Sequence, residues 1–261
     1  MKKEIKRISF SELKNWKECP FRHKLIYIDK LPHFEGNEYT AFGTAIHAVC
    51  EQTIPNVSKH PMKVFEKTFL DELSILTDNG KQTNAELIAE MRKQAVPICE
   101  QVLPSVREYF GNFEVISVEE EILEPITEFN SFDKKFKGFI DMVIKTPDQK
   151  YHLIDWKTCS WGWSKDKKSD PMTNYQLTYY KNYFSKKHQI DPKNIETYFV
   201  LLKRTAKTEN VEVVRITSGY KKTTNALKVL ENAVINIEKH NYLKNRLNCK
   251  YCKFHKTEYC K

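Results

Sequence analysis

The stretch LIDWKTCS, residues 153–160, places two charged side chains in an otherwise apolar run. Because alternate residues of a strand lie on the same face, Asp155 and Lys157 are expected side by side. A carboxylate can bind a divalent metal ion, and a neighbouring ammonium group can orient a water molecule or stabilise charge developing on a phosphorus centre. The pair is therefore either an ordinary ion pair or half of a catalytic site.

A second acidic residue lies in the middle of the preceding apolar segment. Asp141 belongs to GFIDMVI, residues 138–144, where an unpaired ionised carboxylate is costly. If residues 147–149 form the turn of a hairpin, Asp141 and Asp155 meet beside Lys157, and their oxygen atoms suit Mg²⁺ or Mn²⁺. The alternative is a partly buried salt bridge and an unrelated aspartate. Strict alternation predicts one face with Phe139, Asp141 and Val143 and another with Ile140, Met142 and Ile144.

Two predicted helices carry polar residues that could join these carboxylates. His47 lies in the segment 37–54, with Glu51 one turn later on the same helix face. Gln176 and Tyr180 are four residues apart and share a face of a helix over 174–188. Taken alone, His47 is an ordinary core or surface histidine and the Gln/Tyr pair is a polar helix face. Near two carboxylates, the imidazole becomes a third metal ligand, and Glu51 a residue that supports it.

The elements that would position these residues follow from the hydrophobic pattern. Apolar residues at helical spacing predict helices over 9–31 with a break at Pro20, 37–54, 61–76, 83–110 with interruptions at Pro97 and Pro104, 174–188 and 220–243. Alternating β-branched and aromatic residues predict strands over 113–125, 135–146, 150–160, 195–205 and 211–218. This order predicts an α/β fold in one domain, 1–261, with a helical part (1–112), a mixed sheet (113–218) and a C-terminal helix with a cysteine cluster (219–261).

The charge of the chain indicates its class of partner. A net charge of +9 and an isoelectric point of about 9.0 favour a polyanion, nucleic acid first and an anionic membrane second. No apolar run approaches the roughly 18 residues that span a membrane, and the N-terminus lacks the apolar core of a signal peptide. We expect a soluble, cytoplasmic protein without membrane contacts. Trp161 and Trp163, in a lysine-bearing loop, either stack on bases or belong to the core.

The seven cysteines are unevenly distributed. Cys249, Cys252 and Cys260 lie close to the end of the sequence, and Cys19 precedes Pro20 near its start. In a cytosolic protein such clustering indicates a metal site rather than disulfide bonds. The other cysteines are expected to be small buried apolar residues: Cys50, Cys99 and Cys159.

Taken together, these motifs resemble the PD-(D/E)XK nuclease superfamily, and specifically its RecB-like branch. Its G-x-[IV]-D strand is matched by residues 138–141, its D-x-K strand by 155–157, its G-x-x-x-H helix by 43–47, and its Q-x-x-x-Y helix by 176–180. The opening S-x-L-x(5)-C-P pattern is matched by residues 11–20. The matches occur in family order and, with the terminal cysteines, extend from residue 11 to residue 260.

The resemblance implies a restriction-endonuclease-like fold, a mixed central sheet flanked by helices, and a metal-dependent DNA nuclease. The family favours exonuclease action on DNA ends or single strands. It implies that His47, Asp141, Asp155 and the main-chain carbonyl of Trp156 bind Mg²⁺ or Mn²⁺. The implied catalytic residues are Asp141, Asp155 and Lys157, while Gln176 and Tyr180 contact the DNA backbone or hold Lys157 in place.

In RecB-like nucleases of the AddB and CRISPR-associated type, one N-terminal and three C-terminal cysteines bind a [4Fe–4S] cluster. Cys19, Cys249, Cys252 and Cys260 match this set, although the final C-x₇-C interval is longer than the family's, and four thiolates also suit Zn²⁺. With either metal the expected role is structural. The sequence has no G-x(4)-G-K-[ST] phosphate loop, so a helicase, recombination or replication protein would be a separate partner. DNA repair, phage replication and CRISPR adaptation all remain compatible, as do a non-catalytic DNA-binding protein and a zinc-stapled RNA- or protein-binding adaptor.

Overall fold

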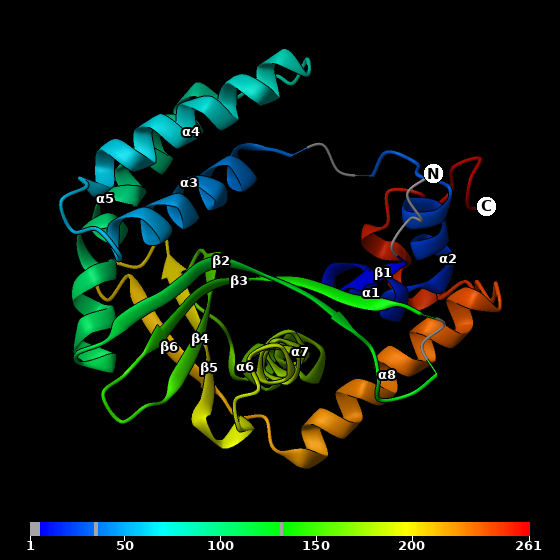
Figure 1. Ribbon diagram of the computed structural model, residues 1–261. Helices are drawn as coiled ribbons and strands as arrows, with labels where there is room; N and C mark the ends of the chain where they lie inside the picture. The colour runs from blue at the N-terminus through cyan, green and yellow to red at the C-terminus, as the bar shows by residue number, and fades with distance from the viewer. Residues whose placement is uncertain (1–5, 34–35, 131–132) are drawn as a thin grey trace, which may run out of the picture.

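The computed structural model describes residues 6–33, 36–130 and 133–261. Within these residues, six strands form one mixed sheet in the order β1-β3-β4-β5-β6, with β2 on the other edge of β3 (Figure 1). β3 pairs antiparallel with β2 and β4, β4 pairs parallel with β5, and β5 pairs antiparallel with β6. The strands are β1 (Arg7–Ser9), β2 (Glu114–Pro125), β3 (Lys135–Lys145), β4 (Tyr151–Cys159), β5 (Ile195–Lys203) and β6 (Val211–Ile216).

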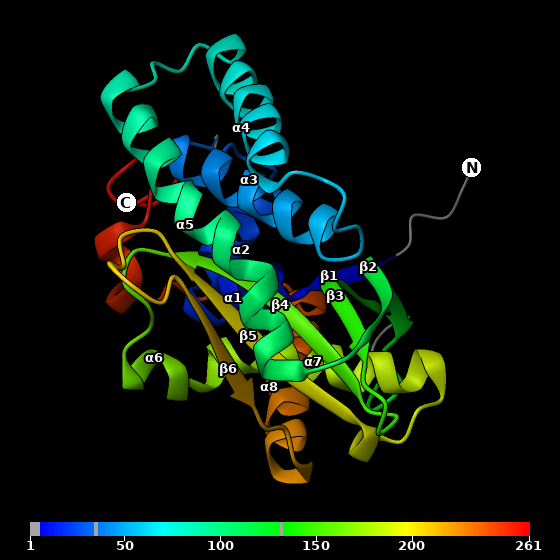
Figure 2. The same ribbon diagram turned by 90° about the vertical axis from the view of Figure 1, so that its left-hand side faces the viewer.

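Helices cover both faces of the sheet. Helices α3, α4 and α5 form an arm over one face, and α7 and α8 pack on the other (Figures 1 and 2). The long helices are α3 (Glu38–Thr53), α4 (Pro61–Asp78), α5 (Ala85–Phe110), α7 (Pro171–His188) and α8 (Tyr220–Glu238). The shorter ones are α1 (Phe10–Glu18), α2 (Pro20–His23), the π-helical turn Lys24–Ile28, α6 (Lys165–Ser169) and the 3₁₀ turns Pro192–Asn194 and Arg246–Tyr251. Among the described residues, no helix is both long and apolar enough to cross a membrane.

The predicted fold class and most elements are confirmed, and the crossover from β4 to β5 passes through α7 as expected for a parallel pair. Ser9 caps the first helix, since the Glu12 N–H donates to Ser9 Oγ at 3.2 Å. The predicted interruptions at Pro97 and Pro104 are wrong, because α5 continues through both prolines. Burial of residues such as Ile98 and Val102 on its inner face offsets the missing backbone hydrogen bonds.

Two apolar cores lie on opposite faces of the sheet. On β4, Ile154 and Trp156 pack under α3 and α5 while Leu153 packs against the α7 side, which confirms the predicted alternation. On β3, Met142 packs under α3 and α5, but Ile140 packs on the α7 side with Val143. The predicted grouping of Ile140 with Met142 is therefore wrong, and regular alternation changes at Asp141.

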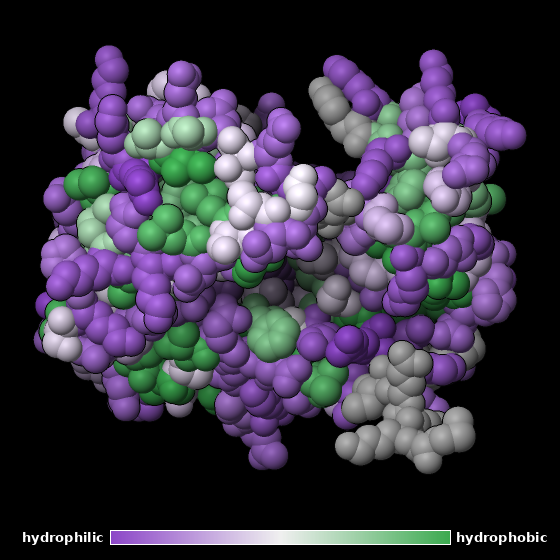
Figure 3. Space-filling view, turned by 90° about the horizontal axis from the view of Figure 1, so that it is seen from above, coloured by the Kyte–Doolittle hydropathy of each residue, from purple (hydrophilic) through white to green (hydrophobic). Residues whose placement is uncertain are grey.

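The irregularity of β3 coincides with a distortion of its neighbour β2. The β2–β3 register shifts between Val115 and Ser117, and Glu119, which lies opposite Asp141, has φ of +49°. A non-glycine residue in the left-handed region within a strand bends and twists it locally. Seen from above, the surface is hollowed between the helical arm and the segments near the chain ends, and mostly hydrophilic residues form the rim (Figure 3).

Candidate active site

The β3–β4 hairpin brings the two aspartates together. Its strands pair from Lys145 and Tyr151 to Met142 and Ile154, and Asp141 and Asp155 lie one residue beyond the last of these pairs. Both residues are buried, at 8% and 1% exposure. The backbone N–H of Trp156 donates to Asp141 Oδ2 at 2.7 Å, so a main-chain hydrogen bond fixes the first carboxylate to the strand that carries the second.

Asp155 and Lys157 are in direct contact. The ammonium Nζ of Lys157 lies 2.5 Å from Asp155 Oδ2 and 5.7 Å from the ring centroid of Phe199 on β5. Asp155 Oδ2 is buried and accepts no hydrogen bond of good geometry from the part of the chain that the structure describes. The other oxygen, Oδ1, accepts from the side-chain amide of Gln176 at 2.6 Å. Each oxygen of Asp155 therefore has a different neighbour, one charged and one neutral.

The helix α7 carries the neutral side chain that holds Asp155, the amide of Gln176. The Gln176 amide lies 3.2 Å from the hydroxyl of Tyr180, which also hydrogen bonds with the backbone of Phe139. Close packing of α7 on β3 depends on Gly138, since a Cβ there would lie 2.6 Å from the Tyr180 ring. Gln176 thus holds Asp155, where the sequence suggested Lys157 or substrate.

The helix α3 adds His47 above the carboxylates. Its Nδ1 lies 3.6 Å from Asp141 Oδ2, and the ring hydrogen bonds with the backbone of Trp156. Burial lowers the pKa of His47 below its ordinary value, which favours the neutral imidazole that binds metal ions. The structure therefore brings together His47, Asp141, Asp155, Lys157 and the main chain of Trp156.

The electrostatic balance of these groups favours a bound cation. Burial, and then the charge of Asp155, raise the pKa of Asp141 well above its ordinary value, while Lys157 opposes this. Among the described residues, no three His, Cys, Asp or Glu side chains converge as a complete metal site; the carboxylate oxygens are instead engaged by Trp156, Lys157 and Gln176. Two buried carboxylates, one of them in contact with an ammonium group, and an adjacent neutral imidazole nevertheless form a donor set that fits Mg²⁺ or Mn²⁺.

Sequence reasoning missed a second acidic pair beside this site. The Glu51 carboxyl hydrogen bonds with Glu119 of β2, and burial together with the Glu119 charge raises the pKa of Glu51 to about 7. Glu119 also raises the pKa of Asp141. The acidic run of residues 119–121 was the only sequence signal, because the contact joins a helix to a distant strand.

The two tryptophans of the loop after β4 differ in their surroundings. Trp161 is 74% exposed, whereas Trp163 packs with its ring centroid 5.0 Å from that of Phe199. Lys167 lies 4.7 Å from the Trp163 ring centroid. Trp163 is therefore part of the core on the α7 side, and Trp161 remains on the surface.

The four terminal cysteines line one small cavity of about 180 Å³ between α2 and the C-terminal segment. Cys19 Sγ accepts hydrogen bonds from the backbone N–H groups of Arg22 and Asn245, both at 3.4 Å. The Phe21 N–H donates to the Leu243 carbonyl at 3.1 Å, which ties the two chain ends together. The cavity is lined by Cys19, Cys249, Cys252 and Cys260, all free thiols.

The remaining cysteines lie apart from this cavity. Cys50 and Cys99 are buried, at 0% and 3% exposure, which confirms their predicted role as small core residues. Cys159 is partly buried against the core on the α7 side.

Comparison with known proteins agrees with this architecture. The profile of the PD-(D/E)XK nuclease superfamily matches residues 7–260. The fold resembles that of a crystallised "putative exonuclease" from Eubacterium rectale, with a TM-score of 0.61 and 13% identity over 95% of this chain and 86% of the other. A second structure, of SSO0001, aligns at 18% identity over 97% of this chain and 85% of the other, with a TM-score of 0.43. No curated protein matches the sequence. Since the profile covers nearly the whole chain, the protein belongs to the PD-(D/E)XK nuclease superfamily.

Proposed function

We propose that this protein is a metal-dependent DNA nuclease of the RecB-like branch that hydrolyses phosphodiester bonds as an exonuclease. The observation that carries the proposal is the pair of buried carboxylates on adjacent strands: Asp155 contacts the ammonium group of Lys157, and Asp141 accepts a hydrogen bond from the neighbouring Trp156 N–H. A structural ion pair needs one carboxylate. A second buried one, whose pKa is raised by burial and then by the charge of the first, points to a site for a divalent cation.

In this proposal, His47, Asp141, Asp155 and the carbonyl oxygen of Trp156 bind Mg²⁺ or Mn²⁺, which when bound would polarise the phosphate and activate water. Lys157, held against Asp155, donates a hydrogen bond to the attacking water. The water oxygen forms a bond to phosphorus as the ester bond breaks, giving a phosphomonoester and a free hydroxyl group. Gln176 positions Asp155, and Gln176 and Tyr180 face the substrate because both line the cavity above the carboxylates.

Cleavage assays with end-labelled single-stranded and duplex DNA test this function. We expect products with Mg²⁺ or Mn²⁺ and none with EDTA, and single nucleotides or short fragments released from ends. Lys157→Ala removes the ammonium group and should lower the rate about 10²–10³-fold. Lys67→Ala, at an exposed position of α4, is the matched control. Metal-independent cleavage, or full activity of Lys157→Ala, would contradict the proposed site. DNA binding without any cleavage would favour a non-catalytic binding protein. A chain that neither binds nor cleaves DNA would favour a zinc-stapled adaptor.

We further propose that Cys19, Cys249, Cys252 and Cys260 bind a structural [4Fe–4S] cluster, with Zn²⁺ as the alternative metal. The shared cavity and the two N–H donors to Cys19 Sγ support a sulfur-ligated metal site. Protein purified anaerobically should be brown and contain iron and sulfide, and Cys252→Ser should lose them while Cys159→Ser keeps them. Colourless protein with one equivalent of zinc would instead identify the tetrahedral alternative.

The biological setting follows from the same proposal. We propose that the nuclease acts in the cytoplasm on DNA ends made accessible by a helicase, recombination or replication protein, in DNA repair or a related process. Co-purification from cells under mild cross-linking, compared between the active chain and Lys157→Ala, would identify such a partner.

A further inference from the structure

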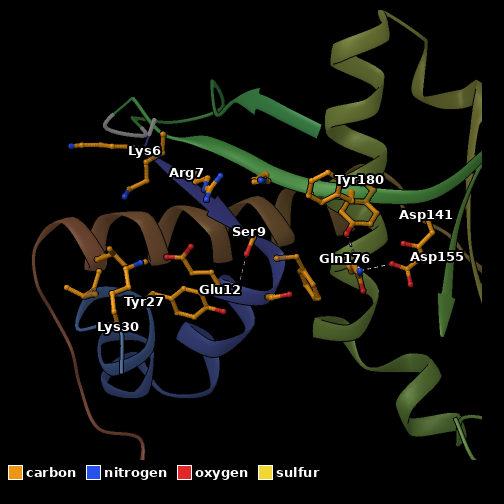
Figure 4. A pocket seen from close by; sticks show the side chains of 18 of the residues that line it. Lys6, Arg7, Ser9, Glu12, Tyr27, Lys30, Asp141, Asp155, Gln176 and Tyr180 are labelled. Carbon is orange, nitrogen blue, oxygen red and sulfur yellow. Dashed lines mark hydrogen bonds between the residues drawn. The ribbon is translucent and has the colours of Figure 1, made fainter. Parts of the chain in front are cut away.

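A cavity of about 880 Å³ runs from the carboxylates to the N-terminal strand. Figure 4 shows Asp141, Asp155, Gln176 and Tyr180 at one end and Lys6, Arg7 and Lys30 at the other. This volume is in the range of pockets that hold small organic ligands, roughly 300–1,000 Å³, and so accommodates a few nucleotides of one strand rather than a turn of duplex. The cavity therefore links the proposed site of cleavage to a basic end.

The basic end carries an excess of positive charge. Five basic residues line it against two carboxylates, those of Glu12 and Glu238; Lys137 also lies 3.5 Å from the half-exposed carboxylate of Glu121, outside the lining. Glu238 is shared by Lys134 at 2.7 Å and Lys6 at 3.9 Å, and Glu12 accepts from the buried His23. These ion pairs are partly exposed and therefore weak, so the basic side chains can leave them to contact the phosphates of a polyanionic chain that lies along this end. The basic residues are Lys6, Arg7, Lys30, Lys134 and Lys137.

An aromatic ring lies between the basic end and the carboxylates. Phe139 of β3 is 40% exposed, whereas the next five residues of the same strand are all buried. Its neighbour across β2 is the charged Glu121, which leaves the ring without an apolar cover from that strand. Phe139 lines the cavity two residues before Asp141, and the Lys137 ammonium lies 5.1 Å from its ring centroid.

The sheet leaves an opening at this ring. On one edge of β3, β1 pairs only with residues 135–137 and β4 only from Met142 onward. Within the described ranges, the stretch between them has no strand partner on that edge, and Tyr180 of α7 contacts its backbone at Gly138 and Phe139. The position of Phe139 is therefore fixed from below by α7, while its ring faces an open cavity.

We propose that Phe139 is a base-stacking residue and Lys137 its neighbouring phosphate contact, and that together they make this cavity a path for single-stranded DNA toward Asp141 and Asp155. An aromatic ring beside cationic side chains is the arrangement that binds unpaired nucleotides without sequence preference, since every base offers a π face. The inference rests on the proposed nuclease function and specifies its substrate as an unpaired strand.

Binding measured in EDTA tests the inference separately from cleavage. Fluorescence anisotropy of a labelled oligo-dT is expected to show that Phe139→Ala weakens binding roughly 5- to 100-fold, and that Phe139→Trp retains it with quenching of the added indole. Lys137→Gln should reduce the slope of log Kd against log salt by about 0.7. Tyr220→Ala removes an aromatic side chain that is 89% exposed and outside the cavity, and should bind as the unmodified chain does.

Removing a single base from the oligonucleotide tests whether Phe139 stacks on a base. Oligonucleotides with one abasic spacer at successive positions should lose affinity for the unmodified chain at one position, and Phe139→Ala should be insensitive to the spacer there. The inference would be overturned, even if cleavage is found, by a folded Phe139→Ala chain that binds the oligonucleotide as tightly as the unmodified chain. It would also be overturned if Phe139→Ala lost the same affinity for blunt duplex as for single-stranded DNA. Loss of binding specific to Phe139→Ala in a chain that never cleaves DNA would uphold this binding path and reject the proposed activity.

Discussion

The carboxylate site and the cysteine cavity are held in place by different means. Asp141 and Asp155 lie on paired central strands, between two large apolar cores, and accept hydrogen bonds from Trp156 and Gln176. The cysteines belong to turns and short helices at the two ends of the chain, over a small cluster of buried residues, Leu25, Ile26 and Phe254. Folding of the sheet is therefore sufficient to position the first site, whereas the segments of the second would be held together by the metal ion or cluster that we propose for it.

Asp155→Asn gives the largest expected effect. It keeps the shape of the side chain but removes one of the two buried negative charges, so the cleavage rate should fall at least about 10²–10³-fold. Burial, and then the charge of Asp155, raise the pKa of Asp141. Removing that charge relieves part of this cost, so the free energy of unfolding in EDTA should stay the same or increase. Steady-state cleavage and thermal melts measure both. Asp71→Asn, at an exposed position of α4, should change neither; a collapse of the fold in Asp155→Asn would show that the ion pair with Lys157 is structural.

Cys252→Ser tests the other half of the comparison. If these cysteines hold the proposed metal, its loss should speed amide hydrogen exchange in residues 244–261 and 19–28 about 100-fold, because those segments have few other buried contacts. Exchange in β3, β4 and β5 should be unchanged. Hydrogen exchange with mass spectrometry resolves the segments, and Cys159→Ser serves as the control. Equal acceleration in the sheet would mean that the two regions unfold as one unit.

Gln176→Ala should act on the carboxylate site without changing its charge. Asp155 Oδ1 would lose its 2.6 Å donor, and residues that orient metal ligands in this way typically affect metal affinity or activity 10- to 100-fold. The rate measured as a function of Mg²⁺ concentration should shift toward higher concentrations. Gln82→Ala, in an exposed loop, should leave the curve unmoved, and a Gln176→Ala curve identical to it would remove Gln176 from the site.

Gly138→Ala should disturb the packing that supports Gln176. The added Cβ would lie 2.6 Å from the Tyr180 ring, and displacement of α7 should cost about 1–3 kcal/mol of stability. Urea unfolding monitored by circular dichroism measures the cost. At Gly219→Ala the added Cβ meets no atom of the described residues within 4 Å, and this variant should lose only a few tenths of a kcal/mol. Similar losses in both variants would show that the ring moves aside freely.

The sequence was sufficient to predict the hairpin because the alternation of LIDWK survives in the folded strand. Leu153 packs on one face, Ile154 and Trp156 on the other, and Asp155 touches Lys157. The same rule failed at Ile140, since regular alternation assumes a regular strand and β2 is distorted opposite Asp141. That distortion belongs to a different segment of the chain, so no local pattern around Ile140 could reveal it.

Two other features depended on tertiary contacts. β1 has only three residues, too few for a periodic signal, yet its pairing with the start of β3 leaves the open edge at Phe139. The contact between Glu51 and Glu119 joins α3 to β2, and spacing within either element cannot predict it. The sequence pattern could therefore predict the strands that carry Asp141 and Asp155. It could not predict a three-residue strand or a contact between carboxylates that lie far apart in the chain.

Glu51→Gln gives the smallest expected effect. It tests how much the buried acidic groups around the carboxylate site lower the stability of the fold. The pKa of Glu51 is about 7 in the folded chain against an ordinary value of 4.5, so its folded form binds a proton more tightly. Its contribution to stability is complete below pH 4.5 and is lost as the pH rises to 7. Because Glu51 is only partly buried, solvent screening reduces the difference to about 1 kcal/mol.

The glutamine variant cannot lose a proton, so its stability should depend less on pH. In EDTA, the melting temperature of the unmodified chain should fall between pH 5 and pH 8 by about 2–4 °C more than that of Glu51→Gln. Asp141 titrates in the same direction in both chains, so the difference isolates Glu51. Glu86→Gln, an exposed glutamate in the first turn of α5, should parallel the unmodified chain. Parallel curves for Glu51→Gln as well would mean that the acidic pair is solvated in both states, and that the buried charge of this site resides in Asp141 and Asp155 alone.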